Sequence, residues 1–272
     1  MQLRLSLPAM STTAAGLVLI PTYNERDNVE LIVRAVLALP KGFDVLIIDD
    51  GSPDGTGAIV RALLPEFGGR LHLEERAGKQ GLGTAYIAGF RWALARGYPF
   101  VFEMDADFSH NPQDLLRLYD ACAVQGYDLA IGSRYSDGVN VVNWPMSRVL
   151  MSYFASKYVR LITGMPIHDA TAGFKCYSAR VLQAIDLTKI HFVGYAFQIE
   201  MKWLTYCLGF RIKEVPIIFT DRTRGQSKMS KGIFKEAFFG VVQMRFNSWL
   251  HPPREAHAAS GAGQFSSGAV AS

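Results

Sequence analysis

The stretch YPFVFEMDADFSH, residues 98–110, decides the fold of this chain. Its first half is an apolar run that is typical of a buried strand, and its second half places Asp105 and Asp107 directly after that run. The apolar runs GLVLIPT, residues 16–22, and FDVLIIDD, residues 43–50, have the same character, and acids also stand at or just after their ends. The sequence therefore indicates several buried strands whose ends carry carboxylates.

Helical segments lie between these strands. In residues 27–39, for example, Val29, Ile32, Val33 and Val36 recur at helical spacing. Further strands are expected at residues 70–75, 128–134 and 211–220, and further helices at residues 57–64, 81–97, 111–126, 144–162 and 195–209. Such alternation forms right-handed βαβ units. We therefore expect an α/β protein with one Rossmann-like domain, in which helices flank a central, mostly parallel sheet.

Five carboxylates fall at or near the predicted strand ends: Glu25, Asp49, Asp50, Asp105 and Asp107. In parallel sheets ligands bind at the carboxyl ends of the strands, so these acids coincide with the expected ligand site. Asp105 and Asp107 are two residues apart, and in an extended segment their side chains would point the same way. Two such charges repel each other unless a cation lies near them. The pattern favours a divalent cation, Mg²⁺ or Mn²⁺, that bridges the diphosphate of a nucleotide.

The composition is that of a soluble globular protein with one large domain, because 49% of the 272 residues are apolar and 19% are charged. The net charge of +4 suits anionic partners such as nucleotides, phosphates or lipid headgroups, but it is too small to indicate nucleic acid. The three cysteines, Cys122, Cys176 and Cys207, lie far apart in apolar surroundings. We interpret them as core thiols.

Both ends of the chain are expected to lie outside the folded domain. We interpret residues 1–13 as a flexible leader, with Met10 as an alternative start, and residues 14–251 as the catalytic domain. Residues 252–272 are rich in Ala, Gly and Ser and are expected to be disordered, because they have too little apolar surface to bury. No segment reaches transmembrane length, so we expect any membrane contact to be peripheral.

Two segments combine apolar with basic residues, at positions 144–162 and 233–250. This pattern suits amphipathic helices that lie in a membrane interface, and ordinary packing on the core is an equally good alternative. For the second segment we expect a C-terminal interface helix.

Nine motifs occur in order along the chain: IPTYNE, IIDDGSPDGT, GLGTAYIAGF, MDADFSHNP, IGSRY, NWPMSR, ATAGFKCY, GYAFQIEM and EVPIIFTDRTRGQSKMS. Any one of them would be weak alone. Together, from about Leu17 to Ser230, they resemble the dolichol- or polyprenol-phosphate mannose synthases, which belong to the inverting glycosyltransferase family two and have the GT-A fold.

The resemblance implies the residues of a donor site. Those that match contacts to guanine and ribose are Pro21, Tyr23 and Glu25, and those that match the pair near the base are Ile48 and Asp50. Asp105 and Ala106 match the floor under the sugar-nucleotide. Arg222 and Lys228 match the basic residues that close over the donor diphosphate, where positive charge stabilises the leaving group.

The resemblance also implies a metal site and an acceptor site. Asp107 corresponds to the direct metal ligand beside Asp105, and Ser109 stands where some members have a glutamine that contacts the metal. The positions that hold the acceptor phosphate are matched by Arg134 and Arg148, with Ser152 one turn further on. Two guanidinium groups can hold a phosphate through charge-assisted hydrogen bonds. The expected catalytic group comprises Asp107, Arg134, Arg222 and Lys228.

The implied activity is transfer of mannose from GDP-mannose to a polyprenyl or dolichyl phosphate, with inversion. A phosphate monoester has a second pKa of about 6, so the acceptor is already an anion and needs no strong general base. Glu200 could serve as a positioning group, and a structural cap or salt bridge is an equal alternative for it.

Two rival functions stay open: transfer of glucose or an amino sugar from a UDP-sugar, and an inactive nucleotide-sugar-binding scaffold. The resemblance further implies a peripheral protein at the cytoplasmic face of a membrane, with or without a separate anchoring subunit.

Overall fold

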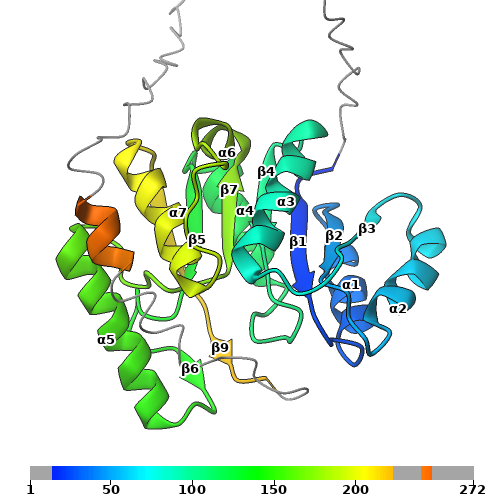
Figure 1. Ribbon diagram of the computed structural model, residues 1–272, viewed down its shortest axis with the longest axis horizontal. Helices are drawn as coiled ribbons and strands as arrows, with labels where there is room; N and C mark the ends of the chain where they lie inside the picture. The colour runs from blue at the N-terminus through cyan, green and yellow to red at the C-terminus, as the bar shows by residue number, and fades with distance from the viewer. Residues whose placement is uncertain (1–13, 223–239, 247–272) are drawn as a thin grey trace, which may run out of the picture.

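The computed structural model describes residues 14–222 and 240–246 (Figure 1). Two parts of the expected organisation, the leader at residues 1–13 and the tail at residues 252–272, lie outside these ranges, as does Lys228.

A seven-stranded sheet forms the centre of the molecule, with the strand order β3-β2-β1-β4-β7-β5-β8. Its strands are β1 (Leu17–Thr22), β2 (Asp44–Asp49), β3 (Leu71–Glu75), β4 (Phe100–Glu103), β5 (Leu129–Ser133), β7 (Lys175–Ser178) and β8 (Ile212–Pro216). Neighbouring strands are parallel except at β7, which is antiparallel to both β4 and β5. The expected mostly parallel sheet is confirmed.

Side chains alternate between the two faces of the sheet, and each face has its own core. Leu17 and Leu19 of β1 belong to one cluster, whereas Val18 and Ile20 belong to the other. The first cluster packs under α3 (Leu82–Ala95), α5 (Met146–Thr163), α6 (Ala179–Ala184) and α7 (Tyr195–Cys207). The second packs under α1 (Val29–Leu37), α2 (Thr56–Leu63) and α4 (Asp114–Ala123). A short 3₁₀ helix, η1 (Leu64–Phe67), follows α2.

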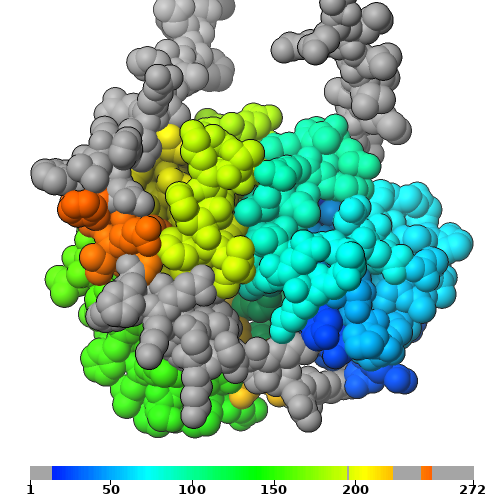
Figure 2. Space-filling model, viewed as in Figure 1, coloured from blue at the N-terminus to red at the C-terminus, as the bar shows by residue number. Residues whose placement is uncertain are grey.

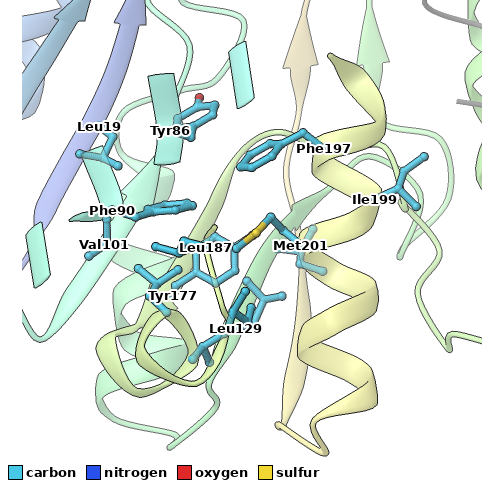
Figure 3. Packing of buried hydrophobic residues seen from close by; sticks show 14 of the residues in the cluster. Leu19, Tyr86, Phe90, Val101, Leu129, Tyr177, Leu187, Phe197, Ile199 and Met201 are labelled. Carbon is cyan, nitrogen blue, oxygen red and sulfur yellow. The ribbon is translucent and has the colours of Figure 1, made fainter. Parts of the chain in front are cut away.

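Aromatic side chains fill much of the first cluster (Figure 3). Tyr86 of α3 stacks on Phe197 of α7, with ring centroids 6.0 Å apart, and Phe90 meets the edge of Tyr177 on β7. These contacts fix α7 against α3, and both helices begin near the carboxyl ends of the parallel strands.

The chain departs from two sequence expectations near the site. The strand expected at residues 211–220 is divided, because the chain leaves the main sheet after β8, where Ile217 donates its N–H to the Ser133 carbonyl at 3.0 Å. Residues beyond it form β9 (Phe219–Thr220), which pairs with β6 (Val141–Val142) in a separate small sheet. Strand β4 also ends earlier than expected, at Glu103, so Asp105 and Asp107 do not lie on an extended strand. Asp105 follows the strand, Asp107 lies in the turn after it, and Phe108 has a left-handed backbone with φ 60°.

Cys122 and Cys176 are buried free thiols, as expected, and Cys207 is half-buried. Residues 240–246 are helical, and their buried side chains, Val241 and Met244, join the first cluster. Val242 and Phe246 of the same segment are exposed. Within residues 14–222 and 240–246, no helix is both long and apolar enough to cross a membrane.

Candidate functional site

The carboxyl ends of β1, β2 and β4 lie at one edge of the sheet, because Thr22 pairs in register with Asp49, and Met104 donates its N–H to the carbonyl of Leu19. Asp49 is used structurally there. Its carboxylate accepts hydrogen bonds from the Thr22 hydroxyl at 2.8 Å and from the Ser52 N–H at 2.9 Å. Asp49 therefore holds the loop after β2 in place.

Asp50, the neighbouring acid, has a different partner. Its Oδ1 lies 3.0 Å from Nη1 of Arg76, and both side chains are largely buried. Arg76 also donates through Nη2 to the Thr84 hydroxyl at 2.6 Å. Burial raises the pKa of the Asp50 carboxyl, although the charge of Arg76 opposes this shift. The sequence interpretation did not include Arg76, which follows β3 directly and fixes the orientation of Asp50.

The other expected donor residues surround this edge. Tyr23 carries the ammonium of Lys79 over its ring at 5.2 Å. Glu25 accepts a hydrogen bond from the Asn28 side chain at 2.9 Å, next to the start of α1. Pro21 is half-buried at the end of β1, and Ile48 is fully buried in the first core cluster. Ile48 therefore exposes no surface at this edge.

Asp107 lies at the centre of the expected metal site. Its Oδ1 accepts hydrogen bonds from the Ser109 hydroxyl at 2.6 Å and the Ser109 N–H at 3.1 Å, and its Oδ2 lies 2.7 Å from Nη2 of Arg222. Asp105 is partly exposed, and Ala106 between the two acids is buried. Desolvation and the charge of Asp107 raise the pKa of Asp105 to about 7. The turn thus concentrates negative charge next to the guanidinium of Arg222.

A pocket of about 470 Å³ leads from Asp105 towards α5. All three residues expected at the acceptor phosphate line it, namely Arg134, Arg148 and Ser152. Most of the remaining wall is apolar or aromatic, including Met151, Phe154, Tyr158, Ile199 and Ile217. In Figure 2, α5 (green) forms one side of the molecule, away from α2. The pocket therefore connects the carboxylate edge of the sheet with an outlying helix.

Arg134 is held by an acid that the sequence interpretation missed. Its Nε and Nη2 donate to the two carboxylate oxygens of Asp169 at 2.7 and 2.6 Å, and Nη2 also donates to the Thr171 hydroxyl at 2.8 Å. Asp169 is fully buried. Burial would raise the pKa of Asp169, but the bidentate contact with Arg134 outweighs it and lowers this pKa.

The loop at residues 168–173, which carries Asp169, is itself held from two sides. Lys202 of α7 is fully buried and donates to the carbonyls of Ala170 at 2.9 Å and Ala172 at 2.6 Å. On the opposite side, Glu214 of β8 accepts from the N–H groups of His168 at 2.8 Å and Asp169 at 2.9 Å. By holding the loop that carries Asp169, Lys202 and Glu214 also fix the position of Arg134, which Asp169 binds.

Arg148 occupies a different environment. Its Nη1 lies 3.0 Å from Oδ1 of Asp221, and its guanidinium lies 4.1 Å from the ring centroid of Trp144. Because Asp221 immediately precedes Arg222, this ion pair ties α5 to the segment that reaches Asp107.

Glu200 does not line the pocket. It accepts hydrogen bonds from the N–H groups of His191 and Phe192, both at 3.1 Å. These contacts support the structural alternative for Glu200.

Comparison with known proteins gives three results. The family model described as glycosyl transferase family 2 matches residues 17–186. Polyprenol monophosphomannose synthase of Mycolicibacterium smegmatis is 49% identical over 231 residues, which cover 85% of this chain and 87% of that protein. Undecaprenyl-phosphate mannosyltransferase of Micrococcus luteus is 48% identical over 228 residues, which cover 84% and 92%.

Among solved structures, a similar one is glucosyl-3-phosphoglycerate synthase from Mycobacterium tuberculosis in complex with Mn²⁺, UDP and glucosyl-3-phosphoglycerate. It has a TM-score of 0.62, covers 84% of this chain and 78% of its own, and is 17% identical. At that identity the similarity shows the fold, which is of the GT-A type.

Proposed function

This chain belongs to glycosyl transferase family 2, and we propose that it transfers mannose from GDP-mannose to a polyprenyl phosphate, with inversion at the anomeric carbon. The two curated relatives, which act on polyprenol or undecaprenyl phosphate by name, support this substrate class. The observation that carries the proposal is the pocket that joins Asp105 to Arg134, Arg148 and the apolar wall of α5. A lipid phosphate requires this combination of cationic and apolar groups.

In this reaction an oxygen of the acceptor phosphate attacks the anomeric carbon of the mannosyl group. A carbon–oxygen bond forms there, the bond from that carbon to the β-phosphate breaks, and GDP leaves with the electron pair. In this proposal Arg222, which pairs with Asp107, stabilises the negative charge on the departing diphosphate. Arg134 and Arg148 orient the incoming phosphate. Because the acceptor is an anion already, a strong general base is unnecessary.

A divalent metal, Mg²⁺ or Mn²⁺, fits the carboxylate edge. Within the described residues no group of three or more His, Cys, Asp or Glu side chains is arranged to hold a metal ion. Asp107 and Asp105 would therefore hold it with few protein ligands, as hard cations bound to nucleotide phosphates often are, and Ser109 would orient Asp107. When bound, the metal would neutralise charge on the leaving diphosphate.

The exposed side of α5 supports peripheral attachment to a membrane, and the cytoplasmic face is the one that we propose. Met146, Phe154 and Leu161 are 69%, 62% and 82% exposed, and Arg148, Lys157 and Arg160 lie on the same helix. Phe154 also lines the pocket, so an isoprenoid chain could pass from the pocket to a bilayer along this helix. A separate anchoring subunit is compatible with this arrangement.

The deciding experiment is a radiolabelled transfer assay with a polyprenyl phosphate acceptor and three donors, GDP-mannose, UDP-glucose and UDP-GlcNAc. We expect lipid-linked product only with GDP-mannose. Product with a UDP-sugar instead would overturn the choice of donor, and no product with any donor would support an inactive scaffold.

A further inference from the structure

Two ring nitrogens in the pocket have no hydrogen-bond partner within the described residues. They are Nδ1 of His110 and Nε1 of Trp144, and both atoms are buried. The His110 side chain is almost fully buried, with 3% of its residue surface exposed, and both residues line the pocket. Buried polar groups in folded proteins are nearly always paired, so two orphans in one pocket require an explanation.

Aromatic packing holds both rings in place. The imidazole of His110 stacks on Phe174, with centroids 4.8 Å apart and planes at 17°, and meets Phe219 edge to face at 5.2 Å. Trp144 packs against the same Phe219 at 5.0 Å. Phe219 is therefore a common neighbour of both rings, and aromatic packing holds the two nitrogens in place without a hydrogen bond to any described residue.

The same cluster contains the two pocket arginines. The guanidinium of Arg134 lies 5.5 Å from the Trp144 ring centroid and 5.6 Å from that of Phe219, and Arg148 lies 4.1 Å from Trp144. Each arginine already has an acid as its partner, Asp169 for Arg134 and Asp221 for Arg148. These acids offset much of the positive charge that an incoming phosphate would meet.

We propose that the ring N–H groups of His110 and Trp144 donate hydrogen bonds to the phosphate of the acceptor lipid, beside Arg134 and Arg148. This inference rests on the proposed function, which supplies a phosphate to this pocket. An indole N–H only donates, so its partner must be an acceptor, and the oxygens of a phosphate monoester are strong acceptors. Because Nδ1 of His110 and Nε1 of Trp144 have no competing partner among the described residues, the phosphate gains these bonds without breaking others, with the His110 proton on Nδ1.

His72 offers a matched control. It is a second histidine with a buried, unpartnered ring nitrogen, Nε2, and it packs on an aromatic ring, Trp92, at 4.7 Å. It lies on β3, at the far end of the strand order, and does not line this pocket. An unpartnered nitrogen alone does not indicate a ligand; its position in the pocket does.

The test compares His110→Phe, Trp144→Phe and His72→Phe with the wild-type chain. Each change keeps an aromatic ring for packing and removes the ring nitrogens. Binding of farnesyl phosphate, a short polyprenyl phosphate, is measured by calorimetry, and farnesol serves as the ligand without phosphate. We expect the dissociation constant for farnesyl phosphate to rise roughly 10-fold or more in the first two variants, as loss of a hydrogen bond to a charged group predicts, and to stay unchanged in His72→Phe.

A structural role alone would lower the melting temperature without a selective loss of phosphate binding. If the His110 or Trp144 variant is too unstable to measure, ring ¹⁵N chemical shifts of the wild-type chain decide. Shifts of both rings with farnesyl phosphate, but not with farnesol, support the inference, whereas unmoved shifts or unchanged affinity overturn it. Because binding is measured without donor, failure of mannose transfer would contradict only the proposed function.

Discussion

Nη2 of Arg222 lies 2.7 Å from Oδ2 of Asp107. The guanidinium therefore places a positive charge where the sequence predicts a metal cation. Asp221, the residue before Arg222, forms an ion pair with Arg148, which lines the pocket. The ion pairs Arg222–Asp107 and Arg148–Asp221 therefore link the carboxylate edge of the sheet to α5. A metal bound as proposed would share the charge of Asp107 with Arg222, so removal of this charge is expected to disrupt both contacts.

Asp107→Asn should lower the transfer rate at least about 100-fold at saturating Mg²⁺ or Mn²⁺, because loss of charge at such a centre removes stabilisation of the transition state. The amide keeps the side-chain volume and its Oδ1 can still accept from Ser109. We therefore expect little change in the melting temperature. Asp137→Asn, at an exposed position, is the control. Near wild-type turnover of the Asp107 variant would exclude Asp107 as the metal ligand.

Asp169→Asn should weaken both stability and acceptor binding. The amide can no longer accept two charge-assisted hydrogen bonds from Arg134, and breaking a buried pair by removing one partner costs about 3 kcal/mol or more. Urea denaturation measures the loss of stability, and steady-state kinetics in detergent measure KM for polyprenyl phosphate. A variant with wild-type stability and an unchanged KM would show that Asp169 does not position Arg134.

The sequence predicts the carboxylate edge of the sheet much better than the pocket lined by Arg134 and Arg148. Strands β1, β2 and β4 are apolar runs followed by acids, so local pattern alone locates Asp50, Asp105 and Asp107 at one edge. Strand β7 is harder, because Lys175 interrupts its apolar pattern. Its ammonium is fully buried against Glu103 at 3.1 Å, and no local pattern reveals a partner so far away in the sequence.

Asp169 illustrates the same limit in the acceptor pocket. It immediately precedes the motif ATAGFKCY, and its partner Arg134 lies 35 residues earlier. The residue matches implied by the resemblance identify which arginines line the pocket, but only the folded chain shows which acids hold them. Lys202 and Glu214 also have partners at least 30 residues away, and both look like ordinary charged residues in the sequence.

Lys202→Met should raise KM for the acceptor several-fold and leave GDP binding unchanged. Methionine fills a similar volume, but it cannot donate to the carbonyls of Ala170 and Ala172, so the loop that carries Asp169 loses its contact with α7. Lys189→Met, at an exposed position, is the matched control. An equal loss of donor and acceptor binding would indicate general destabilisation rather than a role in positioning this loop.

GDP should protect the protein against thermal unfolding more than UDP does, and only with divalent metal present. A ligand that binds the folded state alone at 100 times its dissociation constant stabilises it by about 2.7 kcal/mol, and for a chain of this size that raises the melting temperature by roughly 5–10 °C. The resemblance implies that Asp50, which Arg76 holds in place, lies near the base. A fixed carboxylate there would accept from the two N–H donors on the edge of guanine, whereas uracil offers one. Asp50→Asn should therefore reduce the difference between GDP and UDP, because an amide presents a donor in place of one acceptor oxygen. Scanning calorimetry with each nucleotide, with and without Mg²⁺, measures both effects. A larger shift with UDP in the wild-type chain would assign the donor site to a uridine nucleotide and contradict the choice of GDP-mannose.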